Sequence, residues 1–180
     1  MHVTFAIFAA VLSVASAAPA TMKRQNNCPL QNFAGITITA PGSGKVRWDV
    51  STDSNGLVQP GDLQWFNRDQ PNDSETFVAS VGSQPNLFTF ELRGAQPIGL
   101  SGTELLASNS PATLKVTCNG GCNDFASGND LVGDVCTFEQ TDGTNGLGQC
   151  ITFEAENTVV QLQPCQAGNP GQNFGIFSVA

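Results

Sequence analysis

The sequence contains no tyrosine and one histidine, His2. Because His2 lies in an N-terminal stretch that we expect to be removed, the mature chain would have no histidine general base and no Ser–His or Cys–His pair. Paired carboxylates are the acid–base chemistry that is left, but the spacing of the acidic residues does not single out two of them. We therefore expect a protein that is not an enzyme and that holds no metal and no cofactor.

Basic residues are also scarce, with seven Lys and Arg against fifteen Asp and Glu and a formal net charge of -8. Nucleic acid is a poor partner for such a chain, because there is no basic patch to neutralise phosphates. No stretch after the N-terminal region is as long and apolar as the roughly 20 residues that a membrane-spanning helix needs. We expect no membrane insertion and a monomer that its acidic surface keeps soluble.

The N-terminal region predicts secretion. An apolar run over residues 3–12 is followed by Ala15-Ser-Ala17, a small-x-small cleavage pattern, which indicates a signal peptide over residues 1–17. The dibasic pair Lys23-Arg24 then either ends a propeptide of fungal type over residues 18–24 or belongs to a polar linker. Residues 25–180 have the length of one domain, which we place outside the cell or in the cell wall.

An even number of cysteines behind a signal peptide favours disulfides over a metal or redox site. From spacing alone, Cys118 could bond to Cys122 across a sharp turn, or Cys122 could bond to Cys136. Cys28 would then bond to Cys118 or Cys122. The six cysteines are Cys28, Cys118, Cys122, Cys136, Cys150 and Cys165.

Short runs of Val, Ile, Thr, Phe and Leu alternate with turn residues, and helical periodicity is nearly absent. The best helical candidate, residues 102–108, is too short to change the fold class. Evenly spaced short strands are typical of a sandwich or a barrel. We expect strands at 35–40, 45–50, 63–66, 77–81, 86–92, 97–100, 105–107, 114–118, 131–138, 149–153, 159–162 and 173–179.

These strands can be arranged as an internal repeat. Residues 63–66 align with 160–163, and residues 114–117 can be placed in the same column. The units then end at 86–88, 134–136 and 172–174. Three units of four strands would close a six-stranded barrel capped by three hairpins. A chance alignment of glycine-rich β sequence is the alternative, and the second unit fits worst.

The third unit carries a family resemblance. Its segments GQCITF at 148–153, VQLQPC at 160–165 and QNF at 172–174 resemble one repeat of the ricin-B-type β-trefoil lectins, which has the form G-x-C-L-D … V-Q-L-x-x-C … Q-x-W. The resemblance implies an all-β, β-trefoil domain over residues 25–180 and a disulfide between Cys150 and Cys165. Closing that loop of about 15 residues would contribute roughly 3 kcal/mol.

The resemblance also implies a sugar site made of an Asp, an aromatic residue and an amide. In the first unit Asp49 takes the Asp position if one extra residue is placed before it, Trp65 or Phe66 supplies the aromatic ring, and Asn86 supplies the amide. In the third unit the Asp position is Thr152, so at most one site is intact. The structural alternative is that the tryptophans only build the core.

The signal peptide and the cysteines predict a secreted, disulfide-bonded protein, and the resemblance implies that it is a binding protein whose partners are glycans. The alternatives are an extracellular interaction or inhibitor protein and a cell-wall structural protein. Either would act through its loops, over residues 51–62 and 67–75. Separately, Asn72-Asp-Ser74 is an N-glycosylation sequon in a polar loop.

Overall fold

The protein is described by a computed structural model that covers residues 33–52, 58–67, 73–84, 86–94, 96–120 and 131–179. The predictions about the signal peptide, the propeptide, Cys28, Cys122 and the sequon at Asn72 lie outside these residues. In the described part the chain is almost entirely β, with two short 3-10 helices, η1 (Asp73–Glu75) and η2 (Pro170–Gln172). No helix in this part is long and apolar enough to cross a membrane.

Each expected strand is found, in most cases with small shifts at its ends. The exception is β3, which begins at Val58 and pairs with Thr52, so the expected loop over residues 51–62 is wrong at both of its ends. The helical candidate at 102–108 is instead a turn and a strand. The strands are β1 (Phe33–Thr39), β2 (Val46–Thr52), β3 (Val58–Asn67), β4 (Phe77–Val81), β5 (Leu87–Leu92), β6 (Ile98–Ser101), β7 (Glu104–Ala107), β8 (Leu114–Gly120), β9 (Leu131–Thr141), β10 (Gly146–Thr152), β11 (Gln161–Pro164) and β12 (Phe174–Ser178).

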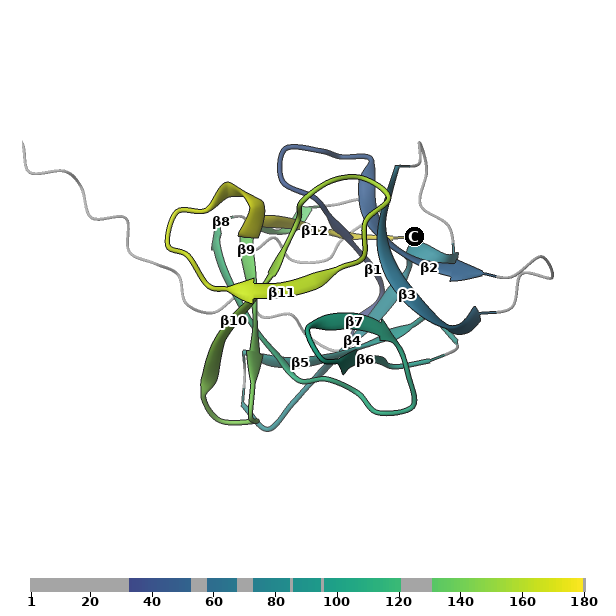
Figure 1. The fold of residues 1–180 in the computed structure, drawn as a ribbon, viewed down its shortest axis with the longest axis horizontal. Coiled ribbons are helices and arrows are strands. Elements are labelled where there is room, and N and C mark those ends of the chain that lie inside the picture. Colours follow the sequence, from purple (N-terminus) through teal and green to yellow (C-terminus); the bar gives the residue numbers. More distant parts are fainter. Residues whose placement is uncertain are drawn as a thin grey trace, which may run out of the picture.

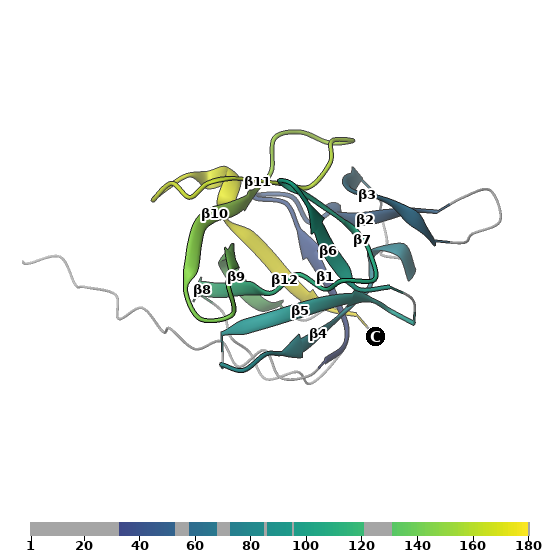
Figure 2. The same ribbon diagram turned by 60° about the horizontal axis from the view of Figure 1, so that its bottom comes forward.

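Figure 1 shows how the strands are arranged. Six of them close a barrel. The antiparallel pairs run β1–β4, β4–β5, β5–β8, β8–β9, β9–β12 and β12–β1, so the ring has no open edge. Figure 2 shows β12 beside β1, where the two ends of the described chain meet. The other strands form the hairpins β2–β3, β6–β7 and β10–β11, which join one another through β3–β7 and β7–β11 pairing. The fold is a β-trefoil of three four-stranded units, as predicted.

Backbone hydrogen bonds among the three hairpins fix how the units align. Trp65 N donates to Thr158 O at 2.9 Å, and Leu162 N donates to Thr103 O at 2.7 Å, so Trp65 and Leu162 are equivalent. This agrees with the alignment of 63–66 with 160–163. Leu105 N donates to Val160 O at 2.9 Å, which brings residues 105–107 into the same column. The placement of 114–117 there is wrong, because those residues form the barrel strand β8.

The predicted unit ends are also wrong for the first two units. The helices η1 and η2 both lie directly before the last strand of their unit, so the counterpart of Gln172-Asn-Phe174 is Glu75-Thr-Phe77. Residues 86–88 instead open β5, and residues 134–136 lie inside β9. Asn86 and Phe88 match the spacing of Gln172 and Phe174 by chance, whereas the true counterpart has an acid, Glu75, in place of the amide.

One apolar core fills the barrel and the space under the hairpins, with residues from all three units. Trp48 lies near its centre and is fully buried. Its ring centroid is 5.4 to 6.3 Å from those of Trp65, Phe77, Phe90 and Phe138. The contacts with Trp65, Phe77 and Phe90 are edge-on, and such contacts add to the large apolar area that each ring buries.

Two disulfides are present in the described part. Cys150 bonds to Cys165, as predicted. Cys118 bonds to Cys136, which lies directly opposite it on the antiparallel strand β9. The three pairings Cys118–Cys122, Cys122–Cys136 and Cys28–Cys118 are therefore wrong, because strand register and not closeness in sequence brings the partners together. Disulfides persist in oxidising compartments, so both bonds fit an extracellular protein.

Candidate functional site

The β2–β3 hairpin separates its side chains onto two faces. Alternate residues of a strand point to opposite sides of the sheet, and Trp48, Val50, Leu63 and Trp65 are buried in the core. Their neighbours occupy the outer face, where Asp49 lies opposite Gln64 and Arg47 lies opposite Phe66. This outer face therefore brings together an acid, an amide, a guanidinium and an aromatic ring.

The position of Asp49 in the repeat follows from strand register. Asp49 pairs with Gln64 in the first unit, and Thr152 pairs with Gln161 in the third. Since Gln64 and Gln161 occupy the same column of the hairpin alignment, Asp49 and Thr152 are equivalent. The strand register thus aligns Asp49 with Thr152, as the alignment of the two units in the sequence does.

The two candidate aromatic residues have different surroundings. Trp65 is fully buried, stacked on Phe174 with ring centroids 5.3 Å apart and edge-on to Phe153 at 5.2 Å. It is part of the core and offers no face to a ligand. Phe66, the next residue, is 37% exposed. Of the two alternatives, Phe66 is the one that can meet a ligand.

Asn86 is not brought to this hairpin. It lies in the turn before β5, and its carbonyl accepts a hydrogen bond of 2.9 Å from Val116 N of β8. The amide beside Asp49 is Gln64. The sequence held a signal for this residue, because Gln64 is the Q of LQWF that matches the Q of VQLQ in the third unit.

The two β2 residues of this face, Arg47 and Asp49, are shielded. Asp49 is 6% exposed. Arg47 is also buried, and its guanidinium donates to Gly44 O at 2.6 Å and to Lys45 O at 3.2 Å. The helix η1 packs against β2 and carries the fully buried Glu75. Phe66 is thus the exposed part of the site, and the acid lies deeper.

The equivalent place in the third unit is filled by the protein itself. Gln172 is buried, and its Nε2 donates to Thr152 Oγ1 at 2.9 Å and to Pro164 O at 3.1 Å. Its Oε1 accepts from Gln166 N at 2.9 Å. The Thr152 hydroxyl donates to Cys150 O at 3.2 Å. Both amide hydrogens and one lone pair of Gln172 are used, so this polar group holds the unit together.

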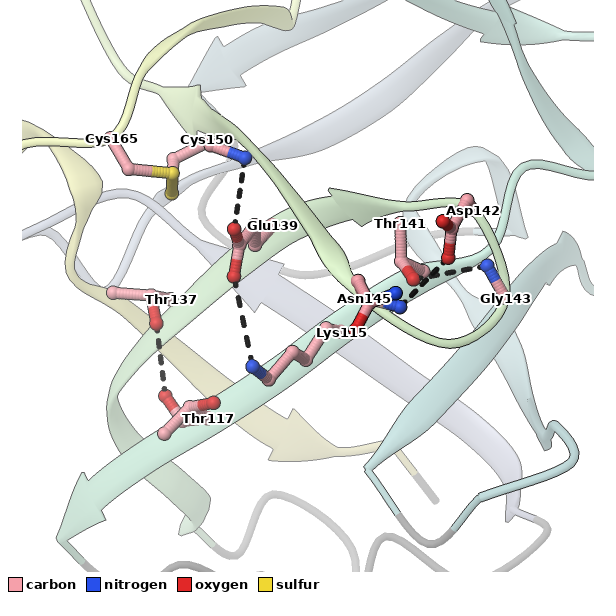
Figure 3. A network of polar contacts seen from close by, with 11 residues as sticks. Lys115, Thr117, Thr137, Glu139, Thr141, Asp142, Gly143, Asn145, Cys150 and Cys165 are labelled. Atoms are coloured by element: carbon pink, nitrogen blue, oxygen red, sulfur yellow. Dashed lines mark hydrogen bonds and ion pairs between the residues drawn. A yellow bond between two sulfur atoms is a disulfide. The ribbon is translucent and has the colours of Figure 1, made fainter.

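A second polar network lies on the barrel wall (Figure 3). Glu139 Oε2 is 3.9 Å from Lys115 Nζ, and Glu139 Oε1 accepts from Gly148 N at 3.0 Å. Asp142 Oδ1 accepts from the backbone N–H groups of Thr144 and Asn145, which lowers the pKa of the Asp142 carboxyl. These contacts join β8, β9 and β10. Among the described residues, no group of three or more His, Cys, Asp and Glu could hold a metal ion.

Comparisons with known proteins define the fold of this chain. No family model matches the sequence, and no curated protein is significantly similar to it. The crystal structure of Cry35Ab1 is similar with a TM-score of 0.59 and 12% identity, over 84% of this chain and 37% of that one. The crystal structure of ThreeFoil, a designed 3-fold symmetric protein, has a TM-score of 0.54 and 12% identity, over 81% of this chain and 99% of that one.

At this level of identity the likeness concerns the fold alone. Cry35Ab1 is a longer protein, of which this chain spans about a third. ThreeFoil matches over nearly its whole length, and its threefold symmetry agrees with the three units seen here. The protein is a β-trefoil with internal disulfides, an architecture compatible with a disulfide-bonded binding protein.

Proposed function

We propose that this protein is a secreted carbohydrate-binding protein with one site, on the outer face of the β2–β3 hairpin. The observation that carries the proposal is the strand register that sets Asp49 opposite Gln64, with the exposed Phe66 two residues further along β3. The third unit closes the same position with its own Thr152 and Gln172. At these two positions the first unit has Asp49 and the buried Glu75.

The three residues offer what a sugar ring requires. A carboxylate accepts hydrogen bonds from hydroxyl groups and makes them stronger than a neutral acceptor would, while an amide both donates and accepts. The C–H face of a pyranose is apolar and can lie on an exposed aromatic ring. A site with Asp49 below and Phe66 at the surface would bind a terminal sugar residue by its ring face and by two neighbouring hydroxyls.

The second unit supports the assignment to a single site. Its residue at the Asp49 position is Gly99, which lies opposite Leu106. A Cβ atom added to Gly99 would lie 2.3 Å from Ser110 O and 2.4 Å from Ser108 Oγ. This unit has neither an acid nor space for one. The signal-peptide pattern and the disulfides support secretion, and the proposal is one of binding without catalysis.

A glycan array tests the proposal on the folded, disulfide-intact chain, and titration calorimetry on the best ligand measures its affinity. We expect Asp49→Asn to weaken binding by about tenfold to a hundredfold, since a hydrogen bond to a charged group contributes about 1.5–3 kcal/mol. We expect Phe66→Ala to weaken binding by about tenfold, since an aromatic contact contributes about 0.5–1.5 kcal/mol beyond its buried area. Gln163→Ala is the matched control, because Gln163 lies opposite Cys150 as Phe66 lies opposite Arg47.

Thermal unfolding of each variant separates lost binding from lost folding. A folded sample that binds no glycan would contradict the proposal and favour an extracellular interaction protein. If Gln163→Ala abolishes binding and Phe66→Ala does not affect it, the sugar site lies on the third unit and the proposal is wrong.

A further inference from the structure

Val135 has an unusual backbone conformation. In the β9–β12 pair, Cys136 lies opposite Phe174 and Gly133 opposite Ile176, so Asp134 and Val135 form a bulge against Gly175. Val135 has a φ of 50°, in the left-handed region that β-branched residues avoid. Such conformations cost about 1–3 kcal/mol and gather at functional sites, and bulges redirect side chains there. Here the bulge leaves the Val135 side chain 37% exposed.

The bulge lines a groove where the third unit meets the first. The groove has a volume of about 390 Å³, within the range of ligand sites. The turn between β1 and β2 forms one side through Pro41, while Val135 and Phe177 supply apolar surface. A Cβ added to Gly175 would lie 2.9 Å from the Phe177 ring, so the glycine lets that ring lie against the backbone.

A related groove shows what the bulge adds. The turn between β9 and β10 and the segment before β8 form a hollow of about 380 Å³, where the second unit meets the third. In the threefold repeat these are the counterparts of the turn between β1 and β2 and of the segment before β12, both of which line the first groove. Among the described residues that line this second groove there is no aromatic side chain and no non-glycine residue with positive φ. The fold thus supplies a hollow, and Val135 and Phe177 make one of the two apolar.

The charge of the first groove is also one-sided. Asp134 is the one charged residue among its described lining. Its Oδ1 accepts from Val135 N at 2.8 Å, so the carboxylate is oriented at the bulge. A carboxylate beside an apolar groove favours a ligand that carries a cation next to apolar surface, and the chain's net charge of -8 would attract such a partner.

We propose that this junction groove binds an extended segment of an extracellular protein in which a Lys or Arg flanks an apolar or proline side chain. The apolar side chain occupies the space between Val135 and Phe177, and the cation pairs with Asp134. Apolar grooves with an aromatic wall receive extended peptides in this way. The site is distinct from the β2–β3 face and does not depend on carbohydrate binding.

Selection of a random-peptide phage library on the full chain tests the proposal. We expect enriched peptides to carry a basic residue next to apolar or proline residues. A selected peptide, labelled with fluorescein, is then measured by anisotropy beside a twin with glutamine in place of the basic residue. Asp134→Asn is expected to weaken the basic peptide about tenfold and to leave the twin unchanged, because Asn can still accept from Val135 N.

Val135→Gly separates a binding role from a structural one. Glycine adopts a positive φ without strain, so the unfolding midpoint is expected to stay the same or rise while peptide affinity falls about tenfold. Leu147→Ala, which removes an exposed side chain from β10, and Asp49→Asn are expected to leave peptide affinity unchanged. The proposal is overturned if no peptide is enriched, if enriched peptides lack basic residues, or if Val135→Gly and Asp134→Asn bind like the parent.

Discussion

The hairpins of the first and third units have the same backbone arrangement but are held by different interactions. In the third unit, Cys150 is bonded to Cys165 and Gln172 holds Thr152. In the first unit the position of Cys150 is Arg47, and the hairpin is held by the burial of Trp48 and Trp65. The repeat therefore keeps strand register and inward apolar positions, while the outward positions change freely. A ligand site can arise at such outward positions because each unit fills them with different groups.

The largest effect is expected where the first unit depends on aromatic packing. Trp48→Ala should lower the free energy of unfolding by about 3–5 kcal/mol, since it removes a fully buried ring that contacts four others. Denaturant unfolding measures the change, with Phe66→Ala as the exposed aromatic control. A loss below about 1 kcal/mol would show that the first unit is not held by its aromatic core.

The third unit should respond most to loss of its disulfide. Cys150→Ser combined with Cys165→Ser opens a loop with a sequence separation of 15 and is expected to lower the free energy of unfolding by roughly 3 kcal/mol. The measurement is denaturant unfolding without reductant. Peptide mapping of the parent protein should find Cys150–Cys165 and Cys118–Cys136. A double variant as stable as the parent would mean that Gln172 and packing suffice.

The polar contribution in the third unit is expected to be smaller. Gln172→Ala leaves Gln166 N without its side-chain acceptor and leaves Pro164 O and Thr152 Oγ1 without a donor. Lost partners at a buried site cost about 1–3 kcal/mol. Thermal unfolding should show the decrease, whereas Gln163→Ala, on the outer face of β11, should change little. If Gln172→Ala and Gln163→Ala lower stability equally, the buried amide of Gln172 contributes no more than the amide of Gln163 on the outer face.

The smallest effect on stability is expected in the turns that precede the two hairpins, between β1 and β2 and between β9 and β10. In the third unit Asp142 accepts from Thr144 N and Asn145 N, and these bonds lower its pKa below the ordinary aspartate value of about 3.9. In the first unit the Ser43 hydroxyl accepts from Lys45 N and Val46 N.

Because the folded pKa of Asp142 is depressed, its contribution to stability is present above the unfolded pKa and is lost as the pH falls through the folded pKa. An NMR titration should find the Asp142 carboxyl below the usual range, and the Ser43 turn unchanged over the same pH interval. If the pKa of Asp142 is in the usual range for aspartate, the two turns do not differ in their response to pH, and this prediction is wrong. Asp142→Asn, which keeps an acceptor, should remove the pH dependence of this turn.

Much of the fold could be predicted because its signals are local. Alternating Ile36 and Ile38, or Val46, Trp48 and Val50, mark half-buried strands wherever they occur. The alignment of units failed where the signal was long-range. Residues 114–117 look like the hairpin strands 63–66 and 160–163, and only the hydrogen bonds of Leu105 and Leu162 show which strand belongs at the cap.

In the candidate site, too, some residues can be predicted from the sequence and others only from the structure. Asp49 and Phe66 could be found from the repeat, because a matching position in a repeat carries its register with it. Gln64 shares a column with Gln161 in the repeat, but its place beside Asp49 follows from strand pairing and not from spacing along the chain. The bulge at Val135 left no pattern in the sequence, since backbone strain is set by tertiary contacts.

The pairing of β1 with β12 has a consequence for how the molecule is made. Residues 36–39 have their partners at 175–178, nearly the whole described chain away. During synthesis the edge of β1 that pairs with β12 stays unpaired until those residues are made. Their pairing then closes the longest loop among the described strands. Long-range closure of this kind slows folding and prolongs exposure of strand edges. An oxidising compartment that forms the Cys118–Cys136 bond early would shorten that exposed interval.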